Sequence, residues 1–301
     1  MKINKKTGKR FTSDTAFDIV NLIFMAFIFI IFAWPLWFIV VASFSDPNAV
    51  TAGKVWLWPV DAHLAGYKMV FENKDIWRGY ANSVFYTVTG TLLNMVMTVC
   101  AAYPLSRWDF MSRKFFTIMF MFTMYFSGGM IPTFLQVKSL GLVDSRLAMI
   151  IPGAVSMFNV LLLRSFFMYG VPISLEEAAK LDGANLRQLL FRVYLPLVKP
   201  TLAVLVLYYA VGHWNDYYTA LIYISNREYL PLQSILREIL ISGQIDFSSG
   251  ALNGESAMEK LKIAGTIKYA VIIVSTVPLM VIYPFIQKHF VKGIMIGAVK
   301  G

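Results

Sequence analysis

The chain has 301 residues, of which 57% are hydrophobic and only 15% are charged, and its mean hydropathy is +0.61. This composition lies outside the range of soluble globular proteins and favours a membrane as the solvent. The formal net charge of +10 would suggest a nucleic-acid partner in a soluble protein. In a membrane chain the same charge follows from topology, so we expect no nucleic-acid binding.

Six apolar runs are long enough to cross a bilayer, whose hydrocarbon core of about 30 Å requires about 20 helical residues. The run nearest the N-terminus follows a basic segment, as in a signal peptide, but its apolar stretch is far longer than the roughly 7 to 15 residues of such a peptide. We therefore predict a retained anchor and an all-α integral membrane protein with six transmembrane helices. The runs cover approximately residues 19–43, 81–106, 115–135, 147–169, 198–222 and 267–288.

Basic residues are concentrated on one side of this predicted topology. With both termini in the cytoplasm, the inner segments 1–18, 107–114, 164–199 and 288–301 hold 16 of the 27 Lys and Arg residues. The outer segments are longer in total and hold fewer, which satisfies the positive-inside rule. We predict a cytoplasmic N-terminal tail, a single membrane domain, a cytoplasmic C-terminal tail and two long outer loops, at 1–18, 19–291, 292–301, 44–80 and 223–266 respectively.

The sequence contains no energy source of its own. It has no G-x-x-x-x-G-K-[ST] stretch for nucleotide phosphates, and its three histidines lack the spacing of a metal site. The predicted spans are nearly free of the ionisable residues that an ion-coupled transporter uses as a relay. Arg164, His213 and Asp216 are the exceptions, and snorkelling or a pore-facing position explains them. We therefore expect no catalytic site, no metal site and no ATP binding by this chain.

The loop between the fourth and fifth runs, residues 170–200, contains helix signals throughout. Pro172 precedes Ser174, and Glu177 follows three residues later with the spacing of a capping box. Gly183 is suited to end or bend the resulting helix. A second helix is expected to run until Pro196. Amphipathicity alone would equally allow a connector at the lipid interface. The apolar positions of the second helix are Leu186, Leu189, Leu190 and Val193.

The spacing within this loop resembles the EAA loop of ATP-binding-cassette (ABC) importer permeases. That motif has Glu-Ala-Ala, three residues, Gly, nine residues and Ile-x-Leu-Pro, and the only departure here is Val193 in place of Ile. The resemblance implies that the loop seats in a cleft of a separate cytoplasmic ATPase, which holds the ATP and Mg, and that this chain needs no cofactor. The residues implied at that interface are Glu176, Glu177, Ala178, Ala179, Asp182, Gly183, Ala184, Leu195 and Pro196.

The rest of the chain is similar to maltose-type carbohydrate permeases, within the subgroup that imports longer or acidic oligosaccharides. Four stretches support this: AYPLSR (102–107), FSGGMIPTFL (126–135), HWNDYYTALIYI (213–224) and FVKGIMIGAVKG (290–301). The resemblance implies alternating access in a bacterial cytoplasmic membrane, with this chain as half of the pathway. The implied partners are a second homologous permease subunit in a heterodimer, two copies of an ATP-binding subunit, an extracellular solute-binding protein, an oligosaccharide and membrane lipid.

Two groups of residues near the outer ends of the predicted spans are candidates for contact with a sugar. Aromatic rings beside amide and carboxylate groups suit sugar ring faces and hydroxyls, and such a group closes the fifth span. An interfacial aromatic belt explains the same residues. A glycine-containing stretch closes the third span, where irregular backbone requires a cavity or protein cover; a plain helix end is the alternative. The candidates are Trp214, Asn215, Asp216, Tyr217 and Tyr218, together with Tyr125, Gly128 and Gly129.

Apolar residues recur at helical spacing in the second outer loop, over about residues 231–242. The amphipathic helix that they predict would lie on the membrane or meet the binding protein, and the sequence leaves both open. The apolar positions of this predicted helix are Leu232, Ile235, Leu236, Ile239 and Leu240.

An ion-driven secondary transporter and a non-transporting assembly or sensing subunit are the rival functions for the whole chain.

Overall fold

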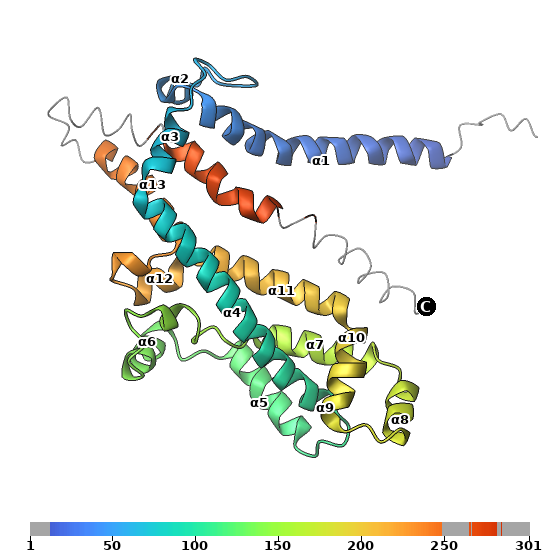
Figure 1. Cartoon of the computed structure of the whole chain (residues 1–301). Helices are drawn as coiled ribbons and strands as arrows, with labels where there is room; N and C mark the ends of the chain where they lie inside the picture. The colour runs from blue at the N-terminus through green and yellow to red at the C-terminus, as the bar shows by residue number, and fades with distance from the viewer. Residues whose placement is uncertain (1–12, 249–264, 266, 282–283, 285–301) are drawn as a thin grey trace, which may run out of the picture. The chain divides into compact units, whose positions relative to one another are not determined.

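The computed structural model describes residues 13–248, 265, 267–281 and 284. All regular elements in these ranges are helices (Figure 1). The described residues form two compact units, one within Met1–Met69 and Asp246–Ile273, the other within Val70–Ile245 and Val274–Gly301. The predicted C-terminal tail 292–301, most of the N-terminal tail 1–18 and the stretch 249–264 of the second outer loop lie outside the described residues.

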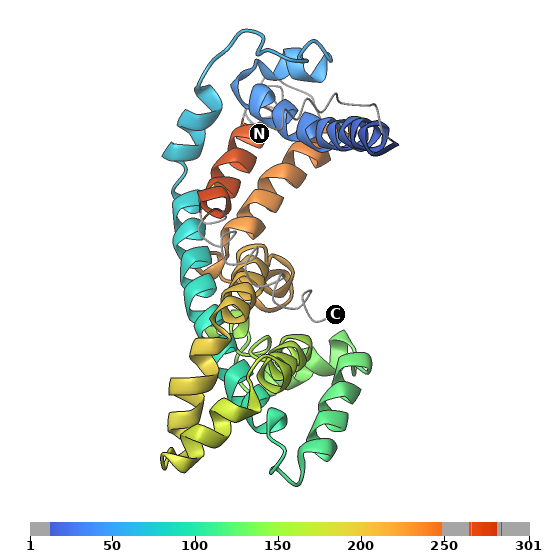
Figure 2. The same cartoon turned by 90° about the vertical axis from the view of Figure 1, so that its right-hand side faces the viewer.

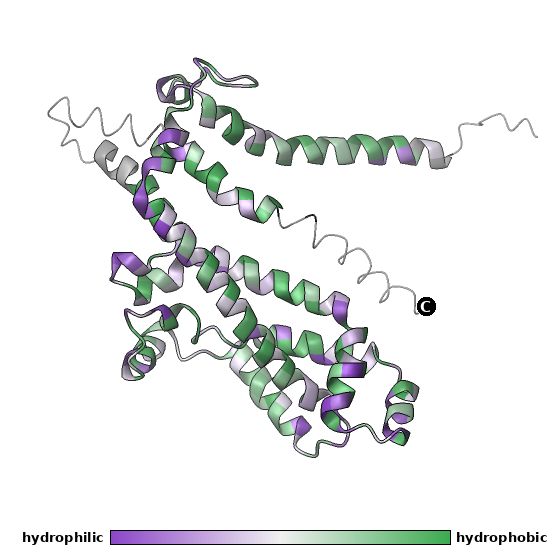
Figure 3. Ribbon diagram, in the orientation of Figure 1, coloured by the Kyte–Doolittle hydropathy of each residue, from purple (hydrophilic) through white to green (hydrophobic). Residues whose placement is uncertain are grey.

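The first unit begins with α1 (Ser13–Phe44), which contains the first predicted span. From Leu22 to Ala42 its residues are all apolar, as the hydropathy colouring in Figure 3 shows, and none in its most apolar window is buried within the chain. A helix that is apolar all round suits lipid. After α1, the short helix α2 (Pro47–Thr51) packs back on it through a small core of Val41, Ala49 and Val55. Helix α3 (Ala65–Glu72) then leads into the second unit.

The long helix α4 (Lys74–Ser106) is the centre of the second unit. Three helices pack along it, as Figure 1 and the turned view in Figure 2 show: α5 (Arg113–Tyr125), α7 (Met157–Tyr169) and α11 (Lys199–Trp214). Small and polar residues on α4 are buried at these contacts, and they allow close approach of the neighbouring backbones. The main core also includes apolar residues from α7 and α11, among them Leu163, Phe167 and Leu205.

Three of the predicted spans are broken rather than continuous. The third ends at Tyr125, and α6 (Met130–Ser139) leaves at 114° after Gly129, whose φ of 91° is accessible mainly to glycine. The fourth begins only at α7, because a 3₁₀ turn (Arg146–Met149) and non-helical residues occupy 146–156. The fifth ends at Trp214, and a separate helix α12 (Tyr218–Tyr223) follows.

By length and composition, two described helices suffice to cross a membrane, or up to five if each bent pair forms one span. The pairs are α5 with α6, α7 with α8 (Ile173–Leu181, bent by 73°), and Leu186–Leu197 with α11 (bent by 81°). A shorter apolar helix, Ile267–Val281, covers part of the sixth run. The count of six spans and the location of the termini stay predictions.

The ionisable residues of the predicted spans are bonded within the protein. Arg164 donates from Nε to a backbone carbonyl at the end of α4 over 2.8 Å, and His213 Nε2 lies 2.7 Å from Asn94 Oδ1. Asp216 accepts a backbone N–H of α12 at 3.0 Å. Snorkelling or a pore-facing position is therefore not needed to explain them, because each has a protein partner where lipid offers none.

Helix α13 (Leu232–Ser248) confirms the predicted amphipathic helix and shows what covers its apolar face. Leu232, Ile235 and Leu236 are buried, and the face packs on α4 at Gly79. The backbone N–H of Leu232 donates to Ser83 Oγ at 2.9 Å. Neither the membrane nor a binding protein covers the face at these three residues, because they are buried within the chain, with Leu232 and Ile235 against Gly79 of α4. A 3₁₀ turn (Arg227–Tyr229) leads into the helix.

We expect Gly79→Ala to destabilise the protein by about 1 to 3 kcal/mol, because a Cβ there would lie 2.5 Å from Ile235 Cδ1 and 3.1 Å from the Leu232 Cα. Gly212→Ala in α11 is the matched control, since a Cβ there meets nothing within 4 Å. Thermal unfolding of the detergent-solubilised protein measures both. Equal midpoints for the two variants would contradict the close packing of α13 on α4.

Candidate functional site

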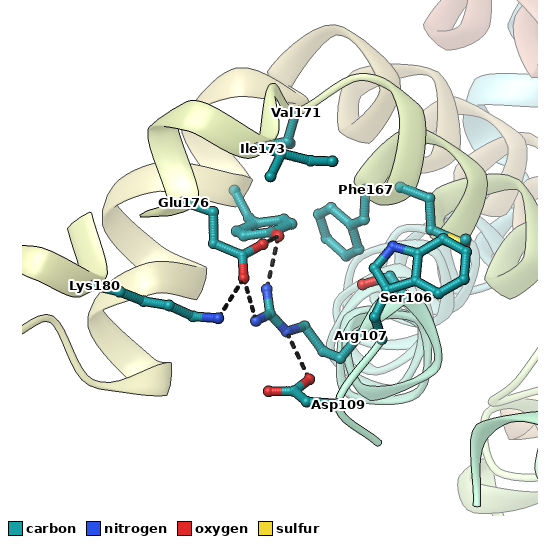
Figure 4. Close-up of a pocket in the computed structure, with 11 residues that line it drawn as sticks. Ser106, Arg107, Asp109, Phe167, Val171, Ile173, Glu176 and Lys180 are labelled. Atoms are coloured by element: carbon teal, nitrogen blue, oxygen red, sulfur yellow. Dashed lines mark hydrogen bonds and ion pairs between the residues drawn. The ribbon is translucent and has the colours of Figure 1, made fainter. Parts of the chain in front are cut away.

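A cavity of about 110 Å³ lies where the end of α4 meets the loop 170–200 (Figure 4). Its walls come from the residues after α4, the end of α7, helix α8 and a π-helical turn (Leu189–Tyr194). One side is apolar and the other holds a group of charged and hydroxyl side chains. The lining residues are Ser106, Arg107, Trp108, Asp109, Phe167, Met168, Val171, Ile173, Glu176, Lys180 and Tyr194.

The Glu176 carboxylate is the centre of the polar group. Arg107 Nη2 donates to Glu176 Oε1 at 2.5 Å, and Lys180 Nζ lies 2.8 Å from the same oxygen. Tyr194 donates its hydroxyl hydrogen to Glu176 Oε2 and accepts from Arg107 Nη1 at 2.7 Å. Asp109 lies at the edge, 3.5 Å from Arg107 Nε. We call Arg107, Glu176 and Tyr194 the clamp, because they join the end of α4, helix α8 and the π-helical turn.

An aromatic wall supports the clamp. The rings of Tyr103, Phe167 and Tyr194 meet edge to face, with centroids 5.3 to 6.0 Å apart. The Arg107 guanidinium lies 5.8 Å from the Tyr103 ring centroid and 5.6 Å from that of Tyr194. Aromatic faces attract cations and exclude water, and both effects strengthen the ion pair with Glu176.

The clamp has one protonation state at neutral pH. Burial alone would raise the pKa of Glu176, but the hydrogen bonds from Arg107, Lys180 and Tyr194 outweigh it and lower this pKa to about 2. Burial alone would lower the pKa of Arg107, but the hydrogen bond to Glu176 and the nearby tyrosines raise it overall. Burial and the bond to Glu176 raise the pKa of Tyr194. Glu176 is therefore ionised, Arg107 protonated and Tyr194 neutral.

Pro172 and Gly183 mark the two ends of helix α8. It begins at Ile173 after Pro172, and no side chain caps it, so the predicted cap by Ser174 is wrong: Ser174 lies inside the first turn. Gly183 ends the helix as predicted, with φ of 76°. The N–H of Gly183 bonds the Lys180 carbonyl and the N–H of Ala184 bonds that of Ala179. This pattern is a Schellman motif.

The second helix of the loop has a cap that the sequence analysis missed. Asn185 and Gln188 form a capping box at the start of α9 (Leu186–Gln188). The π-helical turn follows, and α10 (Leu195–Leu197) ends one residue after Pro196, close to the predicted end of this helix. Proline offers no N–H to the preceding turn, and the irregularity takes the form of the π-helical turn directly before it. The sharp bend comes after Leu197.

The predicted coupling residues divide into inward and outward groups. Glu176 faces the clamp, whereas the adjacent Glu177 is exposed, and α8 has no buried residue. Leu181, an apolar residue, is 90% exposed. The outer side of α8 is thus available to another protein. Of the other predicted residues, Ala178, Asp182, Gly183 and Pro196 are exposed, and Ala179, Ala184 and Leu195 are half-buried.

The two groups of predicted sugar-contacting residues meet in part. Tyr218 Oη lies 3.6 Å from Met130 Sδ at the start of α6, so the break after α11 adjoins the break between α5 and α6. Trp214 is only 5% exposed, donates from Nε1 to the Ser275 carbonyl and packs against Tyr80, so it belongs to the helix packing. The residues that stay exposed are Tyr125, Gly128, Gly129, Asn215, Tyr217 and Tyr218.

Comparison with known proteins decides the family. Residues 79–296 match the family described as binding-protein-dependent transport system inner membrane component. The chain belongs to this family. It is therefore a multi-pass permease component of an ABC transporter in the inner membrane, and it is not an enzyme, since separate ATPase subunits hydrolyse ATP. This confirms the predicted family and the absence of a catalytic role. Such a permease works with ATPase subunits, a substrate-binding protein and a second permease.

Similar proteins extend over nearly the whole chain. The polygalacturonan/rhamnogalacturonan transport system permease protein YtcP of Bacillus subtilis (strain 168) is 42% identical over 287 residues, 95% of this chain and 98% of YtcP. Protein LplC of the same organism is 38% identical over 298 residues, 99% and 97% of the two chains. A crystal structure of a bacterial ABC transporter involved in the import of the acidic polysaccharide alginate has a chain that superposes with a TM-score of 0.83 at 36% identity. The superposition covers 94% of this chain and 100% of the transporter chain.

We expect a double-mutant cycle of Arg107→Met and Glu176→Gln to give a coupling free energy of about 1 to 3 kcal/mol, because the two side chains are only 8% and 18% exposed. The cycle of Arg107→Met with Asp109→Asn is the control. Asp109 is 63% exposed and more distant, so we expect a coupling of about 0 to 1 kcal/mol there. Denaturant unfolding in detergent measures both, and equal couplings would contradict the clamp geometry.

The clamp also predicts an acid-dependent loss of stability. Because the folded pKa of Glu176 is about 2 and its ordinary value is 4.5, its contribution is complete above about pH 4.5 and is lost as the pH falls toward 2. We expect this contribution to be on the order of 1 to 3 kcal/mol after allowance for partial exposure. The unfolding midpoints of wild type and Glu176→Gln should therefore differ by a constant amount above about pH 4.5 and converge between about pH 4.5 and about pH 2. Parallel curves would show that Glu176 is not held ionised.

Proposed function

We propose that this chain forms half of the translocation pathway of an ATP-driven ABC importer for an oligosaccharide, and that the loop 170–200 couples it to a cytoplasmic ATPase. The clamp is the observation that carries the proposal. Helix α8 has no buried residue of its own, yet Arg107 and Tyr194 hold Glu176 and thereby fix α8 to the end of α4. A push on the exposed side of α8 would move α4, and α5, α7 and α11 pack on α4.

Similarity to transporters of sugars supports the substrate class. The name of YtcP specifies polygalacturonan and rhamnogalacturonan, those of more distant relatives specify arabinooligosaccharides and galactooligosaccharides, and the solved transporter is involved in the import of the acidic polysaccharide alginate. We propose as partners a second homologous permease, two copies of an ATP-binding subunit that hold ATP and Mg, and an extracellular solute-binding protein. The EAA spacing and the exposed face of α8 support the contact with the ATPase.

The proposal is tested by ATP hydrolysis and sugar uptake in proteoliposomes that hold the complete transporter with its binding protein. Glu177→Lys changes the exposed face of α8, and Gly183→Asp forces a carboxylate and a Cβ onto a residue with φ of 76°. We expect each to lower substrate-stimulated hydrolysis about tenfold or more, the scale of a coupling free energy of about 1 to 3 kcal/mol. Gly141→Asp is the matched control, because Gly141 has φ of 67° and equally open surroundings in a predicted outer segment.

Unchanged hydrolysis in both loop variants would remove the coupling role from the loop. Stimulated hydrolysis that depends on the loop while no saccharide crosses the membrane would instead indicate a sensing subunit. Loss of stimulation in the Gly141→Asp control to the same degree would show that the loop variants act through general misfolding.

A further inference from the structure

Two segments on either side of α12 bring polar side chains together beside α4. One is the break of residues 215–217 after α11, and the other is helix α13. Both are fixed to α4: Trp214 packs on Tyr80 with ring centroids 5.5 Å apart, and Ile235 packs on Gly79. The side chains that these segments present are therefore held on a rigid support, as a binding site requires.

On α13 the side chains are those of Gln233 and Arg237, which lie one turn apart and away from the buried face of the helix. Gln233 Nε2 lies 3.5 Å from Asn215 Oδ1, and the Arg237 guanidinium carbon lies 5.6 Å from the centroid of the Tyr217 ring. Arg237 and Asn215 are exposed, and Tyr217 is 42% exposed. An aromatic face, two amides and a guanidinium thus line one surface patch, which we call the outer shelf.

The guanidinium of the outer shelf has donors to spare. Among the described residues Arg237 takes part in no ion pair, whereas the adjacent Glu238 lies 3.4 Å from Arg227. Asp216, the carboxylate closest in sequence on the other segment, accepts the backbone N–H of Thr219 at 3.0 Å. Nearby carboxylates are thus already engaged, and a ligand carboxylate would find an unpaired partner in Arg237.

We propose that the outer shelf is a contact site for an acidic saccharide and that Arg237 pairs with a uronate carboxylate. A guanidinium forms two parallel hydrogen bonds to a carboxylate, which an ammonium cannot do. The Tyr217 ring offers an apolar face with a polar edge, and the two amides supply donors and acceptors for sugar hydroxyls. The inference rests on the proposed function, which it deepens by naming the charge class of the substrate and by giving α13 a role.

The test uses the complete transporter in proteoliposomes with its binding protein in excess. The probes are trigalacturonate, trimannuronate and the uncharged maltotriose. We expect ATP-driven uptake of at least one acidic probe, and we expect Arg237→Gln to slow it about tenfold or more, the scale of one lost charge-assisted hydrogen bond. Arg237→Lys should be intermediate. Arg78→Gln, which changes another exposed arginine, 3.8 Å from Asp75, should match wild type.

A second readout separates a sugar contact from protein docking. The concentration of binding protein that gives half-maximal ATP hydrolysis should be unchanged by Arg237→Gln if Arg237 contacts the sugar. An increase in that concentration, with normal uptake at saturation, would overturn the proposal in favour of a docking contact. Equal uptake by Arg237→Gln and wild type would overturn it too.

The same experiment distinguishes this inference from the proposed function. ATP-driven uptake of maltotriose alone would overturn the acidic class and leave the importer function intact. Absence of ATP-driven uptake of any probe, together with hydrolysis that is insensitive to Glu177→Lys and Gly183→Asp, would overturn the proposed function and this inference with it.

Discussion

The Glu176 carboxylate, held by Arg107, Lys180 and Tyr194, is the contact that joins α4 to the loop 170–200 in the second unit. Taking a carboxylate and a guanidinium out of water is costly, and only good geometry with further hydrogen bonds offsets that cost. Here Arg107, Lys180 and Tyr194 donate these hydrogen bonds to Glu176, and the aromatic wall keeps water from them. Helix α8 buries no residue of its own, so the clamp adds directed polar contacts to a helix that otherwise packs only partly against the π-helical turn.

The clamp matters because it ends on α4, around which the second unit is built. Lipid provides little hydrophobic driving force between helices, so close packing and hydrogen bonds must hold them together. Helix α4 supplies both: Asn94 and Thr98 are fully buried, and they bond Gly153 and Tyr209 respectively. A helix that contacts α5, α7, α11 and, at its other end, α13 is suited to carry a movement from one end of the unit to the other.

Much of this was predictable from the sequence, and the failures have physical causes. Long apolar runs located the helices, because a bilayer demands them, and the Glu177–Gly183 spacing located the loop. Hydropathy cannot detect bends, so the break after Trp214 was missed, whereas Gly128 and Gly129 did indicate irregular backbone after Tyr125. The partner of Arg107 was missed because 69 residues separate it from Glu176 and only the fold brings them together.

Helix starts and helix packing also depend on features that sequence patterns did not reveal. The Asn185–Gln188 capping box at the start of α9 was visible in the sequence but was not predicted. For α8, the Ser174–Glu177 spacing predicted a cap at Ser174, whereas the helix begins directly after Pro172. Periodicity predicted α13 as a helix. Which surface covers its apolar face depends on the close approach at Gly79, and no pattern within α13 contains that information.

The π-helical turn Leu189–Tyr194 makes the length of the loop as important as its composition. A π-helical turn contains one residue more than an α-helical turn, and each residue of an α-helix rotates the side-chain direction by about 100°. Tyr194 lies at the end of this turn, in the rotational phase that brings its hydroxyl to Glu176. A relative that kept every side chain of the clamp but lacked one residue between Asn185 and Tyr194 would point that hydroxyl elsewhere. Insertions and deletions in this short stretch should therefore be selected against as strongly as changes to the clamp residues themselves.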